Sequence, residues 1–165
     1  MRNVHLIWDA NHELSMIFPC PACDRANGLS ARDDAKSATC TTCKAPLFGG
    51  HPIHLTVDKF NAHVVEDSPP LLIDFWADWC GPCKTMAPIF EALVAEFEPH
   101  VRFAKVNTDE QRQIAEYFSI QTIPTLSFIY RQREVARNIG VLYHADLRRW
   151  IYSALSEPES TPAAP

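Results

Sequence analysis

The sequence predicts an α/β protein in which helices flank a mixed central sheet, preceded by a small cysteine-rich module. From residue 51 onward, short apolar runs suited to strands alternate with segments of helical periodicity. Residues 16–50 instead contain four of the six cysteines and few large apolar side chains, too few to build a hydrophobic core. Between the two parts, "APLFGGHP" (45–52) carries the Gly and Pro residues of a linker.

The individual elements follow from the apolar pattern. The clearest strand is "LLIDFW" (71–76), a continuous apolar run of the kind that is buried on both faces of a sheet. The clearest helix is "APIFEALVAEF" (87–97), in which four apolar side chains recur at helical spacing: Phe90, Leu93, Val94 and Phe97. Further strands are expected at 53–56, 101–107, 124–130 and 134–140, and further helices at 57–67, 109–118 and 145–155.

A length of 165 residues suits one ordinary domain with an appendage. We expect an N-terminal extension (1–15), the cysteine-rich module (16–50), the α/β domain (51–155) and a Pro- and Ser-rich, disordered tail (156–165).

Charge and hydropathy limit the partners and the location of the protein. The net charge of −5 argues against a nucleic-acid or anionic-membrane partner. No apolar run approaches the roughly 18 residues that span a bilayer. The N-terminus also lacks the apolar stretch of a secretory signal. We therefore expect a cytoplasmic monomer, in a compartment where thiols are kept reduced.

All six cysteines occur in C-x-x-C pairs, and the first two pairs have the spacing C-x2-C-x16-C-x2-C. Two such pairs supply the four tetrahedral sulfur ligands of a structural zinc ion, which would replace the missing core. The alternatives are two redox pairs or a pair of disulfides. Nucleic-acid binding is not favoured, because basic and acidic residues balance between the knuckles and no aromatic residue lies there. The predicted ligands are Cys20, Cys23, Cys40 and Cys43.

The third pair, Cys80 and Cys83, has no second knuckle and follows a buried strand at the start of a helix. Exposed N–H groups and the helix dipole there stabilise a thiolate. Gly81 allows a tight turn, and Pro82 suits the first helical turn because it has no N–H. We expect the Cys80 sulfur to face outward and attack a substrate disulfide, and Cys83, further in, to resolve the mixed disulfide. The alternative is a stray thiol pair or half of a metal site.

The segment "LLIDFWADWCGPCKTMAPIF" resembles the active-site segment of the thioredoxin family, and "FAKVNTDE" and "TIPTL" extend the resemblance over about residues 52–155. The added four-cysteine ribbon resembles that of the zinc-binding second type of bacterial thioredoxin. This resemblance implies a thioredoxin fold and a protein-disulfide reductase in electron transport and cell redox homeostasis. It also implies disulfide-containing substrate proteins, an electron donor such as thioredoxin reductase, and no organic cofactor.

Two residues are expected to assist the thiols. A lone carboxylate in the apolar run, Asp74, is costly to ionise, so its pKa should rise toward neutrality. The family implies that this carboxylate moves the proton of Cys83, as a general acid or base. By the same resemblance, Lys105 is the lysine thought to pair with Asp74.

The resemblance also implies a substrate groove. Pro124 matches the family's cis-proline, and Ile123–Pro124 would present backbone groups to an extended substrate chain. A glycine at position 140 would let the substrate backbone approach closely. The sequence departs from the family at Thr122, where glycine is common, and at the turn 130–134, which lacks Asn-Gly. The expected groove comprises Trp79, Gly81, Pro82, Ile123, Pro124 and Gly140.

Two other functions remain open. A disulfide oxidant or isomerase would need an oxidising compartment, and Gly-Pro between the cysteines supplies no side chain that stabilises a thiolate. A zinc-ribbon adaptor with a binding-only thioredoxin fold would have no need of the intact dithiol. The seven histidines are interpreted as structural or solvent-facing.

Overall fold

The computed structural model describes residues 15–30, 33–65 and 67–156. Most of the expected N-terminal extension and C-terminal tail lies outside these residues. The predicted mixed sheet is confirmed: it has five strands in the order β3-β5-β4-β6-β7. The strands that run parallel are β3 (Ile53–His54), β5 (Arg102–Asn107) and β4 (Leu71–Trp76). The antiparallel hairpin of β6 (Thr125–Tyr130) and β7 (Arg133–Ile139) completes it.

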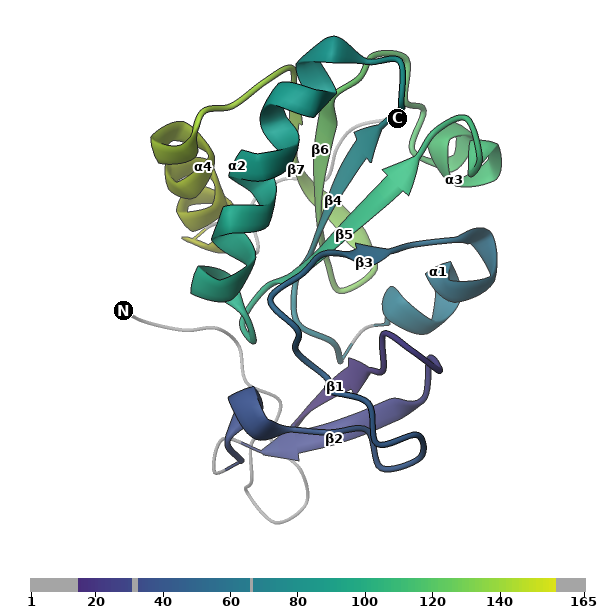
Figure 1. Ribbon diagram of the computed structural model, residues 1–165, viewed down its shortest axis with the longest axis vertical. Helices are drawn as coiled ribbons and strands as arrows, with labels where there is room; N and C mark the ends of the chain where they lie inside the picture. Colours follow the sequence, from purple (N-terminus) through teal and green to yellow (C-terminus); the bar gives the residue numbers. More distant parts are fainter. Residues whose placement is uncertain (1–14, 31–32, 66, 157–165) are drawn as a thin grey trace.

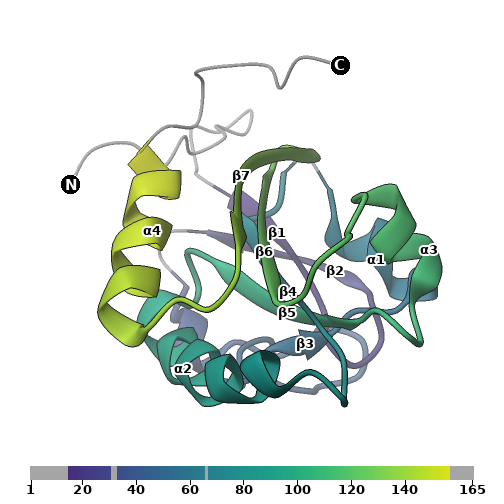
Figure 2. The same cartoon turned by 90° about the horizontal axis from the view of Figure 1, so that it is seen from above.

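Helices cover both faces of the sheet (Figures 1 and 2). One face carries α2 (Gly81–Phe97) and α4 (His144–Ser156), and the other carries α1 (Val57–His63) and α3 (Arg112–Tyr117). The strands alternate their side chains between the two layers, so neighbours such as Leu72 and Ile73 belong to different apolar clusters. The sheet is therefore a rigid central layer, which suits it to hold loops in place at its ends.

Several element boundaries differ from the prediction. The strand at 71–76 begins and ends where the apolar run does, but α1 ends at His63 and α3 spans only Arg112–Tyr117. The helix α2 begins at Gly81, which agrees with the predicted helix start at the C-x-x-C pair, upstream of the periodic segment 87–97. Its first turn contains the C-x-x-C pair, so the apolar period becomes visible only after Met86.

The hairpin turn between β6 and β7 forms without Asn-Gly. Arg131 and Gln132 both adopt positive φ, 48° and 61°, as the two central residues of a tight hairpin turn require. A register shift between Phe128 and Ile129 marks a β-bulge just before this turn. The unusual turn sequence is thus accompanied by a local irregularity in strand pairing.

The cysteine-rich module lies at the end of the α/β domain opposite the start of α2 (Figure 1). It contains an antiparallel pair, β1 (Ser15–Pro19) and β2 (Ala26–Ser30), and a single 3-10 turn, η1 (Ala35–Ser37). Among the described residues, its buried cluster consists of Phe18, Cys20, Cys40 and Leu47, with six partly buried side chains packed against it. A cluster this small cannot hold a fold by apolar burial alone. Among the described residues, no helix is long and apolar enough to cross a membrane.

Candidate active site and metal centre

The third cysteine pair lies where β4 passes into α2. Cys80 is the N-cap of α2 and Cys83 lies in the first helical turn, with a Cα–Cα distance of 5.3 Å, and a disulfide joins the two sulfurs. The backbone N–H of Cys83 donates to the Sγ of Cys80 at 3.2 Å. In the reduced protein, this N–H and the N-terminal end of a 17-residue helix favour a thiolate on Cys80.

The expected difference in exposure between the two sulfurs is absent from the oxidised protein. With the disulfide formed, Cys80 is 3% exposed and Cys83 is 2% exposed. The exposed surface around them belongs to Gly81, Pro82 and Trp79, whose side chain is 70% exposed. The indole Nε1 of Trp79 donates to Asp109 at 2.9 Å. A substrate therefore meets an apolar rim with the disulfide beneath it.

Asp74 is buried in β4, six residues before Cys80. It is 1% exposed, and neither carboxylate oxygen has a hydrogen-bond partner in the described part of the chain. Burial raises the pKa of Asp74 to about 7; the charge of Lys105 opposes this shift and that of Glu91 adds to it. This confirms the predicted rise in pKa and gives the site a carboxyl group that exchanges a proton near neutral pH.

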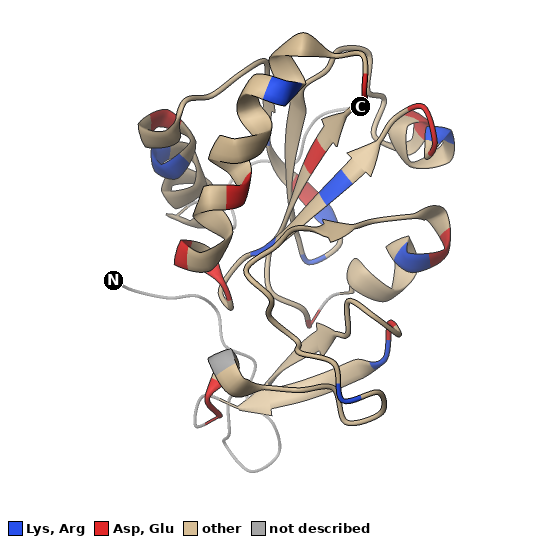
Figure 3. Ribbon diagram, viewed as in Figure 1, with Lys and Arg blue, Asp and Glu red and all other residues tan. Residues whose placement is uncertain are grey.

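The ion pair expected between Asp74 and Lys105 is absent from the described residues. The two residues pair in register on β4 and β5, where Figure 3 shows acidic and basic segments side by side. The Nζ of Lys105 instead lies 3.4 Å from Glu91 Oε1 and 5.0 Å from the ring centroid of Trp76. Glu91 is half exposed and keeps its charge at lower cost than a fully buried carboxylate does. Lys105 thus acts on Asp74 only at longer range, as an electrostatic influence on its pKa.

The proposed groove residues converge on the same end of the sheet. Ile123–Pro124 is a cis peptide immediately before β6, and β6 pairs Thr125 with Phe75 of β4. The N–H of Gly140 donates to the Pro124 carbonyl at 2.9 Å, and Gly140 has a φ of +98°, a conformation that favours glycine. The Pro124 carbonyl is therefore already engaged within the protein.

Some residues of this region were missed by the sequence analysis. Asp109 contacts Trp79, and Glu91 contacts Lys105. No local motif in the sequence marks either acidic residue. Ile139 and Tyr143, 63% and 65% exposed, flank Gly140 in the chain and extend its apolar surface. Helical spacing could have placed Glu91 on the same helix as Cys83, two turns further on.

The four remaining cysteines form a compact cluster. Their sulfurs all lie within 4.8 Å of one another, with 3.6 Å between Cys20 and Cys43 and 3.6 Å between Cys23 and Cys40. Four sulfurs at about 2.3 Å from a tetrahedral ion lie about 3.8 Å apart, so this spacing fits a metal ion without rearrangement.

The two knuckles share one backbone conformation. In the first, Cys20 N donates to Arg25 O at 2.9 Å and Asp24 adopts a φ of 59°. In the second, Cys40 N donates to Ala45 O at 2.8 Å and Lys44 adopts a φ of 64°. A left-handed residue directly after the second cysteine reverses the chain, so both sulfurs of each knuckle face the same point.

Hydrogen bonds to sulfur also suit a set of metal-bound thiolates. The backbone N–H of Thr42 and the amide of Asn27 donate to the Sγ of Cys40 at 3.4 and 3.7 Å. The N–H of Cys43 is the main cause that lowers the pKa of the Cys40 thiol to about 6. Asn27 is 3% exposed and also accepts from Thr41 N at 2.9 Å, which ties β2 to the second knuckle. The cluster can therefore hold a metal ion.

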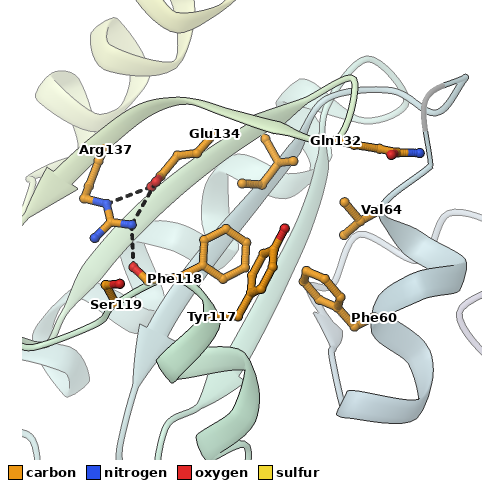
Figure 4. A pocket seen from close by; sticks show the side chains of 9 residues that line it. Phe60, Val64, Tyr117, Phe118, Ser119, Gln132, Glu134 and Arg137 are labelled. Carbon is orange, nitrogen blue, oxygen red and sulfur yellow. Dashed lines mark hydrogen bonds and ion pairs between the residues drawn. The ribbon is translucent and has the colours of Figure 1, made fainter. Parts of the chain in front are cut away.

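A separate hollow of about 310 Å³ lies between α1, α3 and the β6–β7 hairpin (Figure 4). Its walls are aromatic: the ring of Phe60 packs edge-on against Tyr117 and Phe118. At its rim, Arg137 is held by Glu134 at 2.8 Å and by the Phe118 carbonyl at 2.7 Å. It includes no cysteine, and the hairpin turn beside it lies at the opposite end of β6 from Pro124. It is thus separate from the thiol chemistry.

Comparison with known proteins identifies the family to which this chain is similar. The thioredoxin family model matches residues 51–153. The chain belongs to the thioredoxin family. It is 36% identical over 144 residues to Thioredoxin C-3 of Corynebacterium nephridii, covering 87% of this chain and 99% of that protein. It is 38% identical to the thioredoxin of Acidithiobacillus ferridurans over 62% of this chain and 95% of the relative. The thioredoxin of Haemophilus influenzae is 37% identical over 60% of this chain and 92% of its own length.

These relatives, together with the paired cysteines, make the protein a thiol–disulfide oxidoreductase of the disulfide-reductase class. The match to Thioredoxin C-3, over 144 residues, extends well beyond the 103 residues matched to the thioredoxin of Acidithiobacillus ferridurans. It therefore reaches past the α/β domain into the cysteine-rich module.

Proposed function

We propose that this thioredoxin reduces disulfide bonds in other proteins through Cys80 and Cys83, and that its N-terminal module holds one structural zinc ion. The hydrogen bond from Cys83 N to Cys80 Sγ at the N-terminus of α2 is the main support for the first part. It favours charge on Cys80 and leaves Cys83 as the resolving thiol.

The reaction is a two-electron exchange of sulfur partners. The Cys80 thiolate attacks one sulfur of the substrate disulfide, forming a mixed disulfide and releasing the other substrate sulfur as a thiolate. Cys83 then loses its proton and attacks the Cys80 sulfur, which releases the second substrate thiol. The substrate gains two electrons, and the protein ends with the Cys80–Cys83 disulfide seen in the structure. A reductase such as thioredoxin reductase would restore the dithiol.

Asp74 is proposed to take the proton of Cys83 in the second step. Its carboxyl group is buried in β4 and has a pKa of about 7, so it can exchange a proton near neutral pH. With no hydrogen-bond partner among the described residues, it is free to accept a proton directly or through water. Lys105 is proposed to adjust this pKa at long range.

The substrate is proposed to bind as an extended chain between Trp79 and the segment around Gly140. Gly81 and Pro82 form the exposed floor beside the sulfurs, and Ile123, before the cis Pro124, would pair with the substrate through its backbone. Such pairing recognises main chain and not sequence, which suits a reductase with several protein substrates. We propose that it acts as a monomer in the cytoplasm, with no nucleic acid or membrane as partner.

Zinc is proposed because four sulfurs at tetrahedral spacing match its preferred ligands. Cys20, Cys23, Cys40 and Cys43 would hold the ion. Four protein ligands leave no open coordination position, so the ion would stabilise the module and take no part in the exchange reaction.

Single serine variants at Cys80 and Cys83 test the catalytic part. Cys80→Ser should abolish turnover of a model protein disulfide, because the attacking sulfur is missing. Cys83→Ser should accumulate mixed disulfides that are visible on non-reducing gels, because the attack still occurs but is not resolved. Appreciable turnover by Cys80→Ser would reject the assigned nucleophile.

A further inference from the structure

Three basic side chains of the thioredoxin domain lie against the cysteine-rich module. Lys59 and His63 come from α1, and both approach Asp24, the residue after Cys23: His63 Nε2 lies 3.1 Å and Lys59 Nζ 3.6 Å from its carboxylate. Lys59 also donates to the Pro21 carbonyl, inside the first knuckle, at 2.9 Å. The third is Arg102, at the start of β5.

Arg102 is buried about as deeply as His63, with 5% exposure against 4%. Its Nη1 donates to the Leu47 carbonyl at 2.7 Å and lies 3.3 Å from Glu98 Oε1, and its guanidinium stacks 4.8 Å from the Phe48 ring centroid. Leu47 and Phe48 closely follow the second knuckle. One arginine thus joins the module to the sheet and to the end of α2.

The charge of Arg102 is only partly compensated by these contacts. Its Nη2 is buried and has no hydrogen-bond partner in the described part of the chain. Glu98 is the one carboxylate paired with it there, and Glu98 also accepts from Gly50 N at 3.2 Å. Burial raises the pKa of Glu98, so this carboxylate holds its charge less readily than an exposed one. A buried cation with so little compensation is costly unless another negative charge lies nearby.

The cysteine cluster supplies such a charge. Four thiolates around a divalent ion leave a net charge of −2. Cys20, fully buried, packs in the same apolar cluster as Leu47, whose carbonyl Arg102 holds. Burial is the largest influence on the pKa of Arg102 and lowers it, whereas the charges of Glu98 and Cys20 raise it.

We propose that Arg102 is a positioning residue for the metal centre: it compensates the charge of the metal–thiolate cluster and thereby couples retention of the ion to docking of the module on the thioredoxin domain. This inference rests on the zinc site proposed above. It follows that loss of the thiolates leaves Arg102 undercompensated and weakens the module–domain contact. Conversely, loss of the Arg102 charge destabilises the bound ion without touching any ligand.

Zinc release from the full-length protein to a colorimetric chelator tests this proposal. Arg102→Met keeps the approximate length of the side chain and removes its charge, and should speed release by about 10-fold or more, as for outer-sphere residues of metal sites generally. Arg102→Lys keeps the charge but lacks the planar fork, and should fall between Met and the natural protein. The matched control is Arg149→Met, at an exposed arginine of α4 that pairs with Asp146, and should leave the rate unchanged.

Glu98→Gln separates the proposal from simple loss of an ion pair. The amide oxygen of this variant can still accept from Gly50, but the Arg102 charge then acts on the thiolates alone, so zinc should be released no faster than from the natural protein. If Glu98→Gln releases zinc as fast as Arg102→Met, or if Arg102→Met retains zinc like Arg149→Met, the proposal is wrong. Natural protein purified without metal would instead reject the zinc site itself. Cobalt-thiolate absorption of the Arg102 variants provides a second readout that does not depend on reductase activity.

Discussion

Cys80–Cys83 and Cys20–Cys23 have the same spacing, and both pairs have a proline among the two residues between the sulfurs. After Cys83 the chain continues as the 17-residue helix α2, whereas after Cys23 the residue Asp24 adopts a φ of 59° and the chain turns back. In the first pair, the Cys80 sulfur lies at the N-terminus of a helix, and its neighbouring sulfur is that of Cys83. In the second, two sulfurs are left facing another such pair. The conformation that follows the second cysteine, and not the spacing, thus places one pair alone at a helix N-terminus and the other in a cluster that can hold a metal ion.

The largest expected effect comes from removing the four-sulfur set. Replacing Cys20 and Cys40 together by Ser should abolish zinc binding and unfold the module, because structural zinc contributes on the order of 10 kcal/mol to folding. Reductase turnover through Cys80 and Cys83 should persist, since those sulfurs lie at the other end of the domain. Metal analysis and turnover on the same sample check this. Loss of turnover in a folded domain would show that the two sites are not independent.

Asp74→Asn should have the next largest effect, in opposite directions on activity and stability. Removing the proton acceptor should slow release of the mixed disulfide by about 100-fold, the lower range for general acid–base catalysis. In the natural protein this step should slow as the pH falls below about 7, because Asp74 becomes protonated, and the variant should lose that dependence. Stopped-flow measurement from pH 5 to 9 distinguishes the two profiles; an unchanged profile would exclude Asp74 as the acceptor.

The same substitution should stabilise the folded protein at high pH. The pKa of Asp74 is about 7 in the folded state against a reference value of 3.8, so the folded protein binds more protons than the unfolded chain between these values. Stability should therefore fall as the pH rises through this window, by up to about 4 kcal/mol. Urea unfolding of Asp74→Asn should show the gain at pH 8 and little or none near pH 3.5. Equal effects at both pH values would contradict the assigned pKa.

Lys105→Met tests how strongly the lysine charge influences the pKa of Asp74. Because Lys105 pairs with Glu91 and acts on Asp74 only at longer range, its removal should raise the Asp74 pKa and change turnover at pH 7 by only a few-fold. The pH profile should move upward, since the lysine charge lowers this pKa. A loss of turnover as large as that of Asp74→Asn would instead indicate a direct role for the lysine.

The smallest expected effect is at the groove. Gly140→Ala places a side chain at a φ of +98°, although its Cβ would meet no atom within 4 Å. The cost should be about 1 kcal/mol of folding free energy from backbone strain. The Michaelis constant for a protein disulfide should rise, with little change for a small disulfide reagent that makes no main-chain contacts. Equal changes for both substrates would argue against strand pairing at this position.

The sequence allowed prediction of the sheet, the helices and the grouping of the cysteines into a set of four and a separate pair, because each depends on local pattern. The run 71–76 is apolar except for Asp74 and became β4 without a shift, and the positions of the C-x-x-C pairs along the chain separate the set of four from the third pair. The start of α2 was located by the C-x-x-C pair and Pro82, because its first turn, Gly-Pro-Cys-Lys, has no apolar period. The Lys105–Glu91 pair and the docking of Asp24 on His63 were missed. Each joins residues that are distant in sequence, and periodicity carries no information about such contacts.

Metal analysis combined with thiol counting on the reduced, full-length protein tests the division between the two cysteine sites most directly. We predict one zinc ion per chain and two thiols, Cys80 and Cys83, that react freely, with four more appearing only after a chelator removes the ion. A metal-free protein in which all six thiols react alike would contradict it.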